Sequence, residues 1–281
     1  MHKAFLNLHN TTNNNISPLV MGILNVTPDS FSDGGKFTNI DAALQQVEQM
    51  IAHGAKIIDI GGESTRPGAA EVTEADEVNR VIPILKSIKQ RFDVAVSIDT
   101  SKASVMTEAV NYGADMINDV RALQNKGCIE AVAQSEALVC LMHMQGLPRT
   151  MQDNPKYDDV VEDIKIFLSD RVESCINAGI NKERIVLDPG FGFGKTLEQN
   201  YELLARMDEF STMSLPVLAG ISRKSMIGNL LQRPVEQRLA GSLATAIIAA
   251  QKGAKIIRVH DVKETVDALT ILHTVNIAKA K

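Results

Sequence analysis

Arg184-Ile-Val-Leu-Asp-Pro-Gly-Phe-Gly-Phe-Gly-Lys195 contains the unit that this chain repeats, a short apolar run that stops at a polar residue and a glycine-rich loop. Residues 185–187 are aliphatic without alternation, which is typical of a parallel strand buried on both faces. Asp188 stands at the carboxyl end of this strand, because the proline after it cannot extend a central strand. The glycines that follow alternate with Phe191 and Phe193. We therefore predict a binding loop whose backbone approaches a ligand and whose two aromatic rings line it.

The same stretch ends in Gly194-Lys195-Thr196, which is similar to the end of a phosphate-binding P-loop. That motif requires a glycine five positions before the Gly-Lys pair, and Pro189 stands there. A nucleotide-binding P-loop is therefore disfavoured. The plainer alternative, an irregular turn with two buried rings, stays open.

Apolar runs of the same kind recur along the whole chain, and segments with helical spacing separate them. The predicted strands are residues 19–24, 57–60, 94–98, 116–117, 138–142, 185–187, 217–221 and 256–259. Helical faces are clearest within residues 44–51, 78–88 and 160–176. Thr73 and Ser101 are candidate N-caps. Glycine ends the helix before four of the strands, at Gly54, Gly113, Gly179 and Gly253.

Strand and helix units that alternate without a second compositional regime favour a single (β/α)8 barrel over an open doubly wound sheet. The joints from helix to strand are about two to four residues, whereas the loops after the first, second, fifth and seventh strands are much longer. Barrel enzymes keep their sites on such loops, at the carboxyl ends of the strands. We predict an α/β fold, one TIM barrel over residues 1–281, with residues 1–17 as a partly flexible N-terminal extension and the active site at the C-terminal rim of the strands.

The composition describes an ordinary globular protein. Of 281 residues, 44% are hydrophobic and 22% are charged, and the formal net charge is -5. No basic field recruits nucleic acid or an anionic membrane, so an anionic ligand must be bound locally. No apolar run approaches the eighteen or so residues of a membrane span, and the amino terminus lacks the apolar core of a signal peptide. Cys128, Cys140 and Cys175 follow no metal-binding spacing, so we expect buried thiols and a cytoplasmic protein.

Polar side chains follow the end of every predicted strand. They are Asn25, residues 63–66, Asp99, Asn118, Asp119, His143, Asp188, Ser222, Lys224, Arg258 and His260. The set has no Ser/His/Asp order and no cysteine paired with histidine, and its histidines are too scattered for a zinc site. It is rich in planar groups that form paired hydrogen bonds, and in cations. Such groups suit a flat heterocycle that bears several N–H groups and is attached to a phosphate.

These residues lie within motifs that resemble those of the bacterial dihydropteroate synthases. The motifs are Met21-Gly-Ile-Leu-Asn-Val-Thr-Pro-Asp-Ser-Phe-Ser-Asp-Gly-Gly35, Asp59-Ile-Gly-Gly-Glu-Ser-Thr-Arg-Pro-Gly68, Ser97-Ile-Asp-Thr100, Ile117-Asn-Asp119, the stretch quoted first, Ser222-Arg-Lys224 and Arg258-Val-His260. The resemblance covers nearly the whole chain in order. The polar tract from Thr11 to Asn15 has no place on the family pattern.

The resemblance implies a transferase of folate synthesis that joins 4-aminobenzoate to 6-hydroxymethyl-7,8-dihydropterin diphosphate. Diphosphate departs first, which requires stabilisation of its charge rather than a strong base, and the arylamine then adds. It further implies a Mg2+ ion, a homodimer and a sulfonamide target. The residues expected to bind the pterin diphosphate are Thr65, Asp99, Asn118, Asp188, Lys224, Arg258 and His260. Those expected around 4-aminobenzoate are Phe31, Thr65, Arg66, Pro67, Phe193 and Ser222. The catalytic group is expected to be Asn25, Arg66, Lys224, Arg258 and His260, with Asn25 also as the metal ligand.

Plainer roles are expected for several polar residues. Asp59 is favoured as a satisfied interior carboxylate, and Glu63 is balanced between a partner for loop backbone and a site residue. His143 is favoured as a barrel-end histidine. Arg121, Arg149 and Lys195 are expected on solvated faces.

Three other functions stay open on sequence alone. A pterin-dependent methyl transfer domain shares the barrel but does not need Arg258, His260 and Arg66 to converge on a diphosphate. A phosphate-binding barrel isomerase or lyase needs an acid/base pair and a glycine loop after the seventh strand. A non-catalytic pterin-binding barrel is the third alternative, and an assay for diphosphate release separates all three from the synthase.

Overall fold

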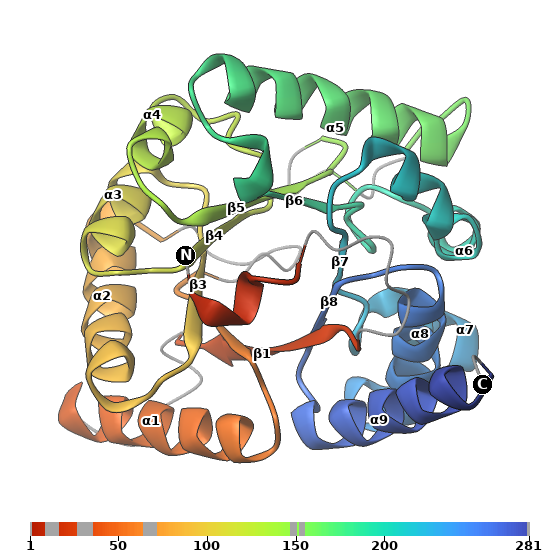
Figure 1. Ribbon diagram of the computed structural model, residues 1–281, viewed down its shortest axis with the longest axis horizontal. Coiled ribbons are helices and arrows are strands. Elements are labelled where there is room, and N and C mark those ends of the chain that lie inside the picture. The colour runs from red at the N-terminus through yellow and green to blue at the C-terminus, as the bar shows by residue number, and fades with distance from the viewer. Residues whose placement is uncertain are drawn as a thin grey trace.

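Eight parallel strands, counted over the described part of the chain, form one sheet that curves into a barrel (Figure 1). The structure is a computed structural model that describes residues 2–8, 17–26, 36–63, 72–146, 151 and 155–279, with residues 36–39 described by their backbone. The strands are β1 (Leu19–Asn25), β2 (Ile57–Gly61), β3 (Ala95–Asp99), β4 (Met116–Asp119), β5 (Leu138–Met142), β6 (Ile185–Asp188), β7 (Leu218–Ala219) and β8 (Ile256–Val259). Their hydrogen-bonded order is β6-β5-β4-β3-β2-β1-β8-β7.

The two end strands of this order also meet. Leu187 of β6 forms a parallel bridge with Val217, and the Leu187 N–H donates to the carbonyl oxygen of Pro216 at 2.9 Å. Because this contact joins β6 to the residues that lead into β7, the sheet closes on itself. The predicted single barrel is confirmed, and the open doubly wound sheet is excluded.

Helices surround the barrel and bury their apolar faces against the strands (Figure 1). They are α1 (Lys36–Ala52), α2 (Glu74–Arg91), α3 (Ala103–Asn111), α4 (Cys128–Ala133), α5 (Val160–Asn177), α6 (Leu197–Ala205), α7 (Ser225–Leu231), α8 (Leu239–Gln251) and α9 (Val262–Lys279). Short 3-10 helices are η1 (Lys3–Phe5), η3 (Lys182–Arg184), η4 (Met207–Met213) and η5 (Val235–Gln237). No helix in the described ranges is long and apolar enough to cross a membrane.

The local signals of the sequence are mostly confirmed. Thr73 caps α2 by accepting a hydrogen bond from the Asp76 N–H. The four glycines expected at helix ends all have positive φ, at Gly54, Gly113, Gly179 and Gly253. The three cysteines are free and buried, as expected.

Two expectations about element ends are wrong. Ser101 does not cap α3, because its hydroxyl donates to the Asp119 carboxylate and the residue before the helix is Lys102. The seventh strand was predicted over residues 217–221, but β7 is only Leu218–Ala219. Beyond the strand the chain turns at residues 221–224, where the Lys224 N–H donates to the Ile221 carbonyl oxygen at 3.1 Å and Arg223 adopts a φ of 56°.

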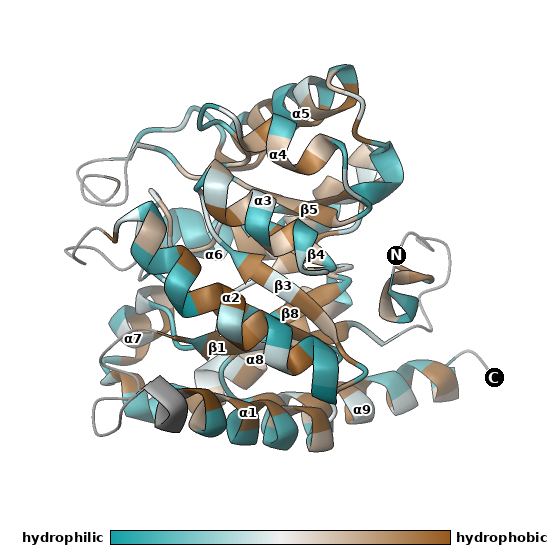
Figure 2. Ribbon diagram, turned by 90° about the vertical axis from the view of Figure 1, so that its left-hand side faces the viewer, coloured by the Kyte–Doolittle hydropathy of each residue, from teal (hydrophilic) through white to brown (hydrophobic). Residues whose placement is uncertain are grey.

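The amino-terminal end of the barrel is closed by residues 2–8, which lie at one end of the molecule in the side view of Figure 2. Phe5 and Leu8 are buried and belong to one apolar cluster with inward-facing residues of the strands. We call this cluster the apolar plug, and its strand members are Met21, Ile57, Ala95, Met116, Leu138, Cys140, Val186, Leu218 and Ile256.

The barrel interior changes from apolar to polar toward the C-terminal rim. Alternate residues of a strand share one face, so the residue two positions after each strand member of the apolar plug also points into the barrel, one layer closer to the rim. On β2 Ile57 is followed by Asp59, and on β3 Ala95 is followed by Ser97 and then Asp99. The same change places Asn118, Asp188 and Arg258 above Met116, Val186 and Ile256. The fold therefore holds a polar layer over an apolar floor.

Candidate active site

The strand register brings the predicted site residues onto a common level at the rim. Asn25 of β1 pairs with Gly61 of β2, Gly61 pairs with Asp99 of β3, and Asp99 pairs with Asn118 of β4. Gly61 has no side chain, which leaves room between Asn25 and Asp99. Parallel pairing thus explains why residues far apart in the sequence lie side by side.

Arg258 connects Asp99, which is at the rim, with Asp59, which lies one layer deeper in the barrel. Its Nε donates to Asp59 Oδ2 at 2.6 Å, and its terminal NH2 group donates to Asp99 Oδ2 at 2.8 Å. Each carboxylate thus receives its own N–H, so the planar guanidinium is fixed in orientation. Asn118 joins the network through Nδ2, which donates to Asp59 Oδ2 at 3.3 Å.

The charges of this network depend on its burial. Burial raises the pKa of Asp99 to about 7, and the nearby Arg258 charge opposes that rise. Burial alone would lower the pKa of Arg258, but the charges of Asp59 and Asp99 outweigh burial and raise it. Arg258 therefore stays protonated, whereas Asp99 changes its protonation near neutral pH.

Asp188 is buried at the end of β6, and the loop after it (residues 189–195, the Asp188 loop) fixes one of its oxygens. The Gly190 N–H donates to Asp188 Oδ1 at 2.8 Å. Burial raises the pKa of Asp188, and the charge of Lys224 is the main opposing influence. Gly190, Gly192 and Gly194 all have positive φ, which explains the alternation of glycines in this loop.

The Phe193 ring lies beside Lys224, whereas the Phe191 ring is turned into the core. The Lys224 ammonium group is 4.5 Å from the centroid of the Phe193 ring, and it donates to the Phe191 carbonyl oxygen. Burial lowers the pKa of Lys224 to about 8, against the influence of Asp188. The Phe191 ring is fully buried in the core, so the expectation that two rings line the loop is wrong for Phe191.

Ser222 and His260 form a second pair on the rim. The distance from Ser222 Oγ to His260 Nδ1 is 3.1 Å, and the His260 backbone N–H donates to Ser222 Oγ at 3.2 Å. His260 and Asn25 are both exposed, so they face the space above the polar layer. This arrangement can receive an anionic group above a buried, hydrogen-bonding pocket.

The expected site is described only in part. The structure brings together the carboxylates, Asn118, Lys224, Arg258, Ser222, His260 and Phe193, with Asn25 at the edge. Phe31, Thr65, Arg66 and Pro67 lie outside the described residues, as do Arg149 and the tract from Thr11 to Asn15.

Lys195 is buried, contrary to the expectation from the sequence. It was expected on a solvated face, but its ammonium group is 2.8 Å from the Gly190 carbonyl oxygen, 3.1 Å from that of Phe193 and 3.1 Å from His143 Nδ1. Burial lowers the pKa of Lys195 well below its usual value and, together with the Lys195 charge, lowers that of His143 to about 2. The lysine holds the Asp188 loop through these two carbonyl oxygens. The one sequence feature that indicated its burial is its position within a loop of glycines and aromatic residues. Arg121 is half-buried.

Glu63 supports backbone near the rim. Its Oε1 accepts a hydrogen bond from the Val72 N–H at 3.1 Å, and its Oε2 contacts Lys102, which also contacts Glu77. These contacts agree with the structural alternative for Glu63. They also show that Lys102 and Glu77, which no sequence motif indicated, hold the base of the loop after β2.

The described residues contain no group of three or more histidine, cysteine, aspartate or glutamate side chains that could enclose a metal ion. Asn25 offers an amide oxygen at the exposed end of β1. A single hard oxygen fits a Mg2+ ion that keeps most of its waters and binds phosphate oxygens. It does not fit a zinc site, which needs nitrogen or sulfur ligands.

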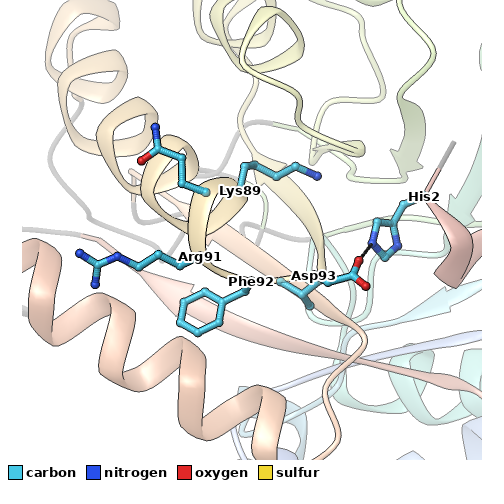
Figure 3. A pocket seen from close by; sticks show the side chains of 7 residues that line it. His2, Lys89, Arg91, Phe92 and Asp93 are labelled. Carbon is cyan, nitrogen blue, oxygen red and sulfur yellow. Dashed lines mark hydrogen bonds and ion pairs between the residues drawn. The ribbon is translucent and has the colours of Figure 1, made fainter.

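A separate hollow of about 410 Å³ lies at the opposite end of the barrel, between the end of α2 and the amino terminus (Figure 3). It is lined by His2, Lys89, Gln90, Arg91, Phe92, Asp93 and Val94. His2 Nε2 is 3.3 Å from Asp93 Oδ1 across it. Because it lies beside the amino-terminal end of β3 and not at the carboxyl ends of the strands, this hollow is not the site described above.

Comparison with known proteins identifies the family. A family model described as pterin binding enzyme matches residues 21–260. The chain is 56% identical to the dihydropteroate synthase of Haemophilus influenzae over 90% of this chain and 92% of the relative. It is also 56% identical to that of Escherichia coli (strain K12) over 93% of each.

Solved structures give the same result. The Yersinia pestis dihydropteroate synthase with a sulfonamide drug complex superposes with a TM-score of 0.88 and 57% identity, over 92% of this chain and 94% of that one. The Xanthomonas albilineans dihydropteroate synthase with 4-aminobenzoic acid superposes with a TM-score of 0.87 and 49% identity, over 93% and 94%. The chain therefore belongs to the dihydropteroate synthases, a family of pterin-binding barrel enzymes.

Proposed function

We propose that this protein performs its family's reaction with the rim residues described above. In this reaction 4-aminobenzoate attacks the exocyclic methylene of 6-hydroxymethyl-7,8-dihydropterin diphosphate, and diphosphate leaves. The observation that carries the proposal is that one rim combines largely buried acceptors with cations: Asp99 accepts a hydrogen bond from Arg258, and the charge of Lys224 acts on buried Asp188. That combination suits a ring edge rich in N–H donors attached to an anionic leaving group.

The pterin ring would bind in the polar layer. Asp99, Asn118 and Asp188 supply acceptor oxygens, and ionised carboxylates accept paired N–H bonds well. Lys224 would donate to the pterin carbonyl or a ring nitrogen. Its ammonium group is held by the Phe191 carbonyl oxygen, which supports a fixed position for this donor.

The diphosphate would lie over Arg258 and His260. Arg258 is held by two carboxylates and keeps its charge, so it needs no proton transfer to stabilise the departing group. The Ser222 hydroxyl lies within hydrogen-bonding distance of the His260 ring, which supports one orientation of the imidazole. Departure of diphosphate leaves a cation at the methylene that the pterin stabilises, and the arylamine then adds without a strong base.

The 4-aminobenzoate pocket would be formed by Phe193 and Ser222, together with Phe31, Thr65, Arg66 and Pro67. Phe193 and Ser222 flank Lys224 and His260, so they are near enough to the expected reaction centre for this role. Arg66 would also contact the leaving group. A sulfonamide drug of similar shape would compete for this pocket, as the Yersinia pestis neighbour was solved with such a drug.

Asn25 would hold a Mg2+ ion through its amide oxygen, with water and diphosphate oxygens as the other ligands. When bound, this ion would neutralise negative charge on the diphosphate. We expect formation of dihydropteroate by the purified protein to stop in excess chelator and to return when Mg2+ is restored. Undiminished turnover in excess chelator would exclude the metal assignment.

The whole chain is proposed to be one domain that forms a homodimer in the cytoplasm. Exposed apolar side chains on α7, α8 and α9 support an interface there: Leu230, Leu231, Ile248, Ile271 and Val275. The buried free cysteines are in keeping with a reducing compartment. Sedimentation of the purified protein tests the dimer.

The decisive assay for the proposed function follows diphosphate and dihydropteroate in the same reaction. We expect the two products in equal amounts when both substrates are present. A methyl transfer domain or a non-catalytic barrel would release no diphosphate. Release of diphosphate without dihydropteroate would show hydrolysis, and it would contradict the proposed transfer.

A further inference from the structure

Three polar atoms in the barrel interior lack a hydrogen-bond partner within the described part of the chain. They are Asp59 Oδ1, Ser97 Oγ and Asn118 Oδ1. Asp59 and Ser97 are fully buried, and 4% of Asn118 is exposed. Asp59 pairs in register with Ser97, so the two side chains are neighbours on the inner face of the sheet. Buried polar atoms without partners are costly, and their clustering beneath a ligand site indicates that they serve it.

Asp59 is more than a satisfied interior carboxylate. Its Oδ2 accepts from Arg258 Nε at 2.6 Å and from Asn118 Nδ2 at 3.3 Å. A carboxylate held by an arginine is an acceptor only. Asn118 must therefore turn its NH2 group toward Asp59, which leaves its carbonyl oxygen Oδ1 as the atom available to a ligand.

We propose that Asp59 is a positioning residue that sets the hydrogen-bonding polarity of the pterin pocket. It orients Asn118 so that the amide presents an acceptor, and it orients the Arg258 guanidinium through a separate bond. This inference rests on the proposed function and adds to it a determinant of ligand choice. With Asn118 held in this way, the side chains of Asn118, Asp99 and Asp188 all offer acceptor oxygens to the ring.

A pocket with this polarity selects a ring edge that carries N–H donors. A 2-amino-4-oxopteridine has an exocyclic amino donor, whereas a 2,4-dioxopteridine has a carbonyl acceptor at that position. Two facing acceptors repel each other and leave both unpaired, so the dioxo ligand should bind at least about 30-fold more weakly. If Asn118 could rotate its amide, it would offer Nδ2 to the dioxo ligand and the preference would shrink.

The test measures calorimetric binding of these two diphosphate-free ligands to the full-length wild-type protein, Asp59→Asn, Asn118→Ala and the double variant. We expect Asp59→Asn to reduce the preference for the amino ligand tenfold or more, because the amide at residue 59 no longer dictates how Asn118 turns. In the Asn118→Ala background, Asp59→Asn should change the preference less than threefold, because the side chain through which it acts is gone. Asp115→Asn is the matched control, since Asp115 is a carboxylate bonded to Lys89 and to the Val96 N–H, away from the rim. It should leave the preference unchanged.

An unchanged preference in Asp59→Asn, or an equal effect with and without Asn118, would overturn the inference. If the wild-type protein binds neither ligand, the proposed function fails first, so the two failures are distinguishable. A measurement on the wild-type protein covers the case in which Asp59→Asn does not fold. The Asn118 side-chain amide signal, identified by its loss in Asn118→Asp, should be protected from hydrogen exchange in the absence of ligand, and rapid exchange would overturn the inference.

Discussion

Replacement of Asp99 by asparagine should remove much of the catalytic efficiency. Asp99 Oδ2 accepts a hydrogen bond from Arg258 at 2.8 Å, and the Arg258 charge is maintained by two carboxylates. An asparagine at this position would turn its carbonyl oxygen toward the guanidinium, because Arg258 offers only donors. Its NH2 group would then face the donors of the pterin ring, where the wild-type protein offers an acceptor.

The size of the effect follows from these contacts. One hydrogen bond to a charged acceptor is lost, and one donor stays unpaired in a pocket where the Asp99 side chain is only 13% exposed. The two losses together are worth about 2 to 4 kcal/mol, which corresponds to roughly 30- to 1000-fold in kcat/KM for the pterin diphosphate. The variant should also bind a diphosphate-free pterin more weakly, since the lost contact is made to the ring.

The assay is steady-state formation of dihydropteroate, with calorimetric binding of the bare pterin as the second readout. Asp267→Asn is the matched control, because Asp267 is 65% exposed on α9 and pairs only loosely with Lys263 at 3.4 Å. The control should stay within threefold of the wild-type protein. If kcat/KM of Asp99→Asn falls less than threefold, Asp99 does not contact the pterin.

Three further predictions concern pH, the leaving group and the loop. Because burial raises the pKa of Asp99 to about 7 and also raises that of Asp188, both carboxyls bind protons more readily than usual and lose acceptor character as the pH falls. The affinity for a bare pterin should therefore rise from about pH 6 to about pH 8, centred on the pKa of Asp99, and level off above that range; a flat titration curve would contradict this. His260→Ala should lower turnover more than it weakens binding of the bare pterin, because the contact of His260 with the diphosphate strengthens as charge builds on that leaving group. Asp188→Ala should mainly weaken binding of the bare pterin, because its contact with the ring changes little. Equal loss of pterin binding in both variants, with normal turnover for His260→Ala, would contradict the roles assigned to His260 and Asp188. Gly190→Ala should lower the free energy of unfolding in urea by more than about 3 kcal/mol, because the added Cβ would lie 1.8 Å from the His143 carbonyl oxygen at a φ of 73°. Gly179→Ala, at a φ of 90° with no atom within 4 Å of the Cβ, should lose only about 1 kcal/mol, and similar losses in both would refute the steric argument.

The repeating strand and helix units of the fold were predictable, because each buried parallel strand leaves a local apolar run in the sequence. The seventh strand was predicted too long, since Ile221 is as apolar as a strand residue but begins the turn that contains Ser222 and ends at Lys224. Apolar character indicates burial, and it does not tell a strand from a buried turn. The Ser101 cap failed for a related reason, because a tertiary partner, Asp119, takes its hydroxyl.

The rim residues were predictable because a polar residue at the carboxyl end of a buried parallel strand must lie at the rim of the barrel. What the sequence did not contain is the pairing among them. Lys195 was expected in solvent because lysine is usually exposed, and only the structure shows that two carbonyl oxygens and His143 surround it. The forked contact of Arg258 joins residues that are 199 and 159 positions apart, and no local pattern records such a distance.

The apolar plug has a consequence for how the protein is made. Phe5 and Leu8 are synthesised long before Ile256 of β8, yet all three belong to the same cluster. Phe5 and Leu8 therefore cannot complete their packing until β8 has been synthesised. Contacts of such sequence separation form slowly and leave apolar surface exposed in the meantime. In a nascent chain of this protein, residues 2–8 should thus stay accessible to chaperones and proteases until translation has passed β8.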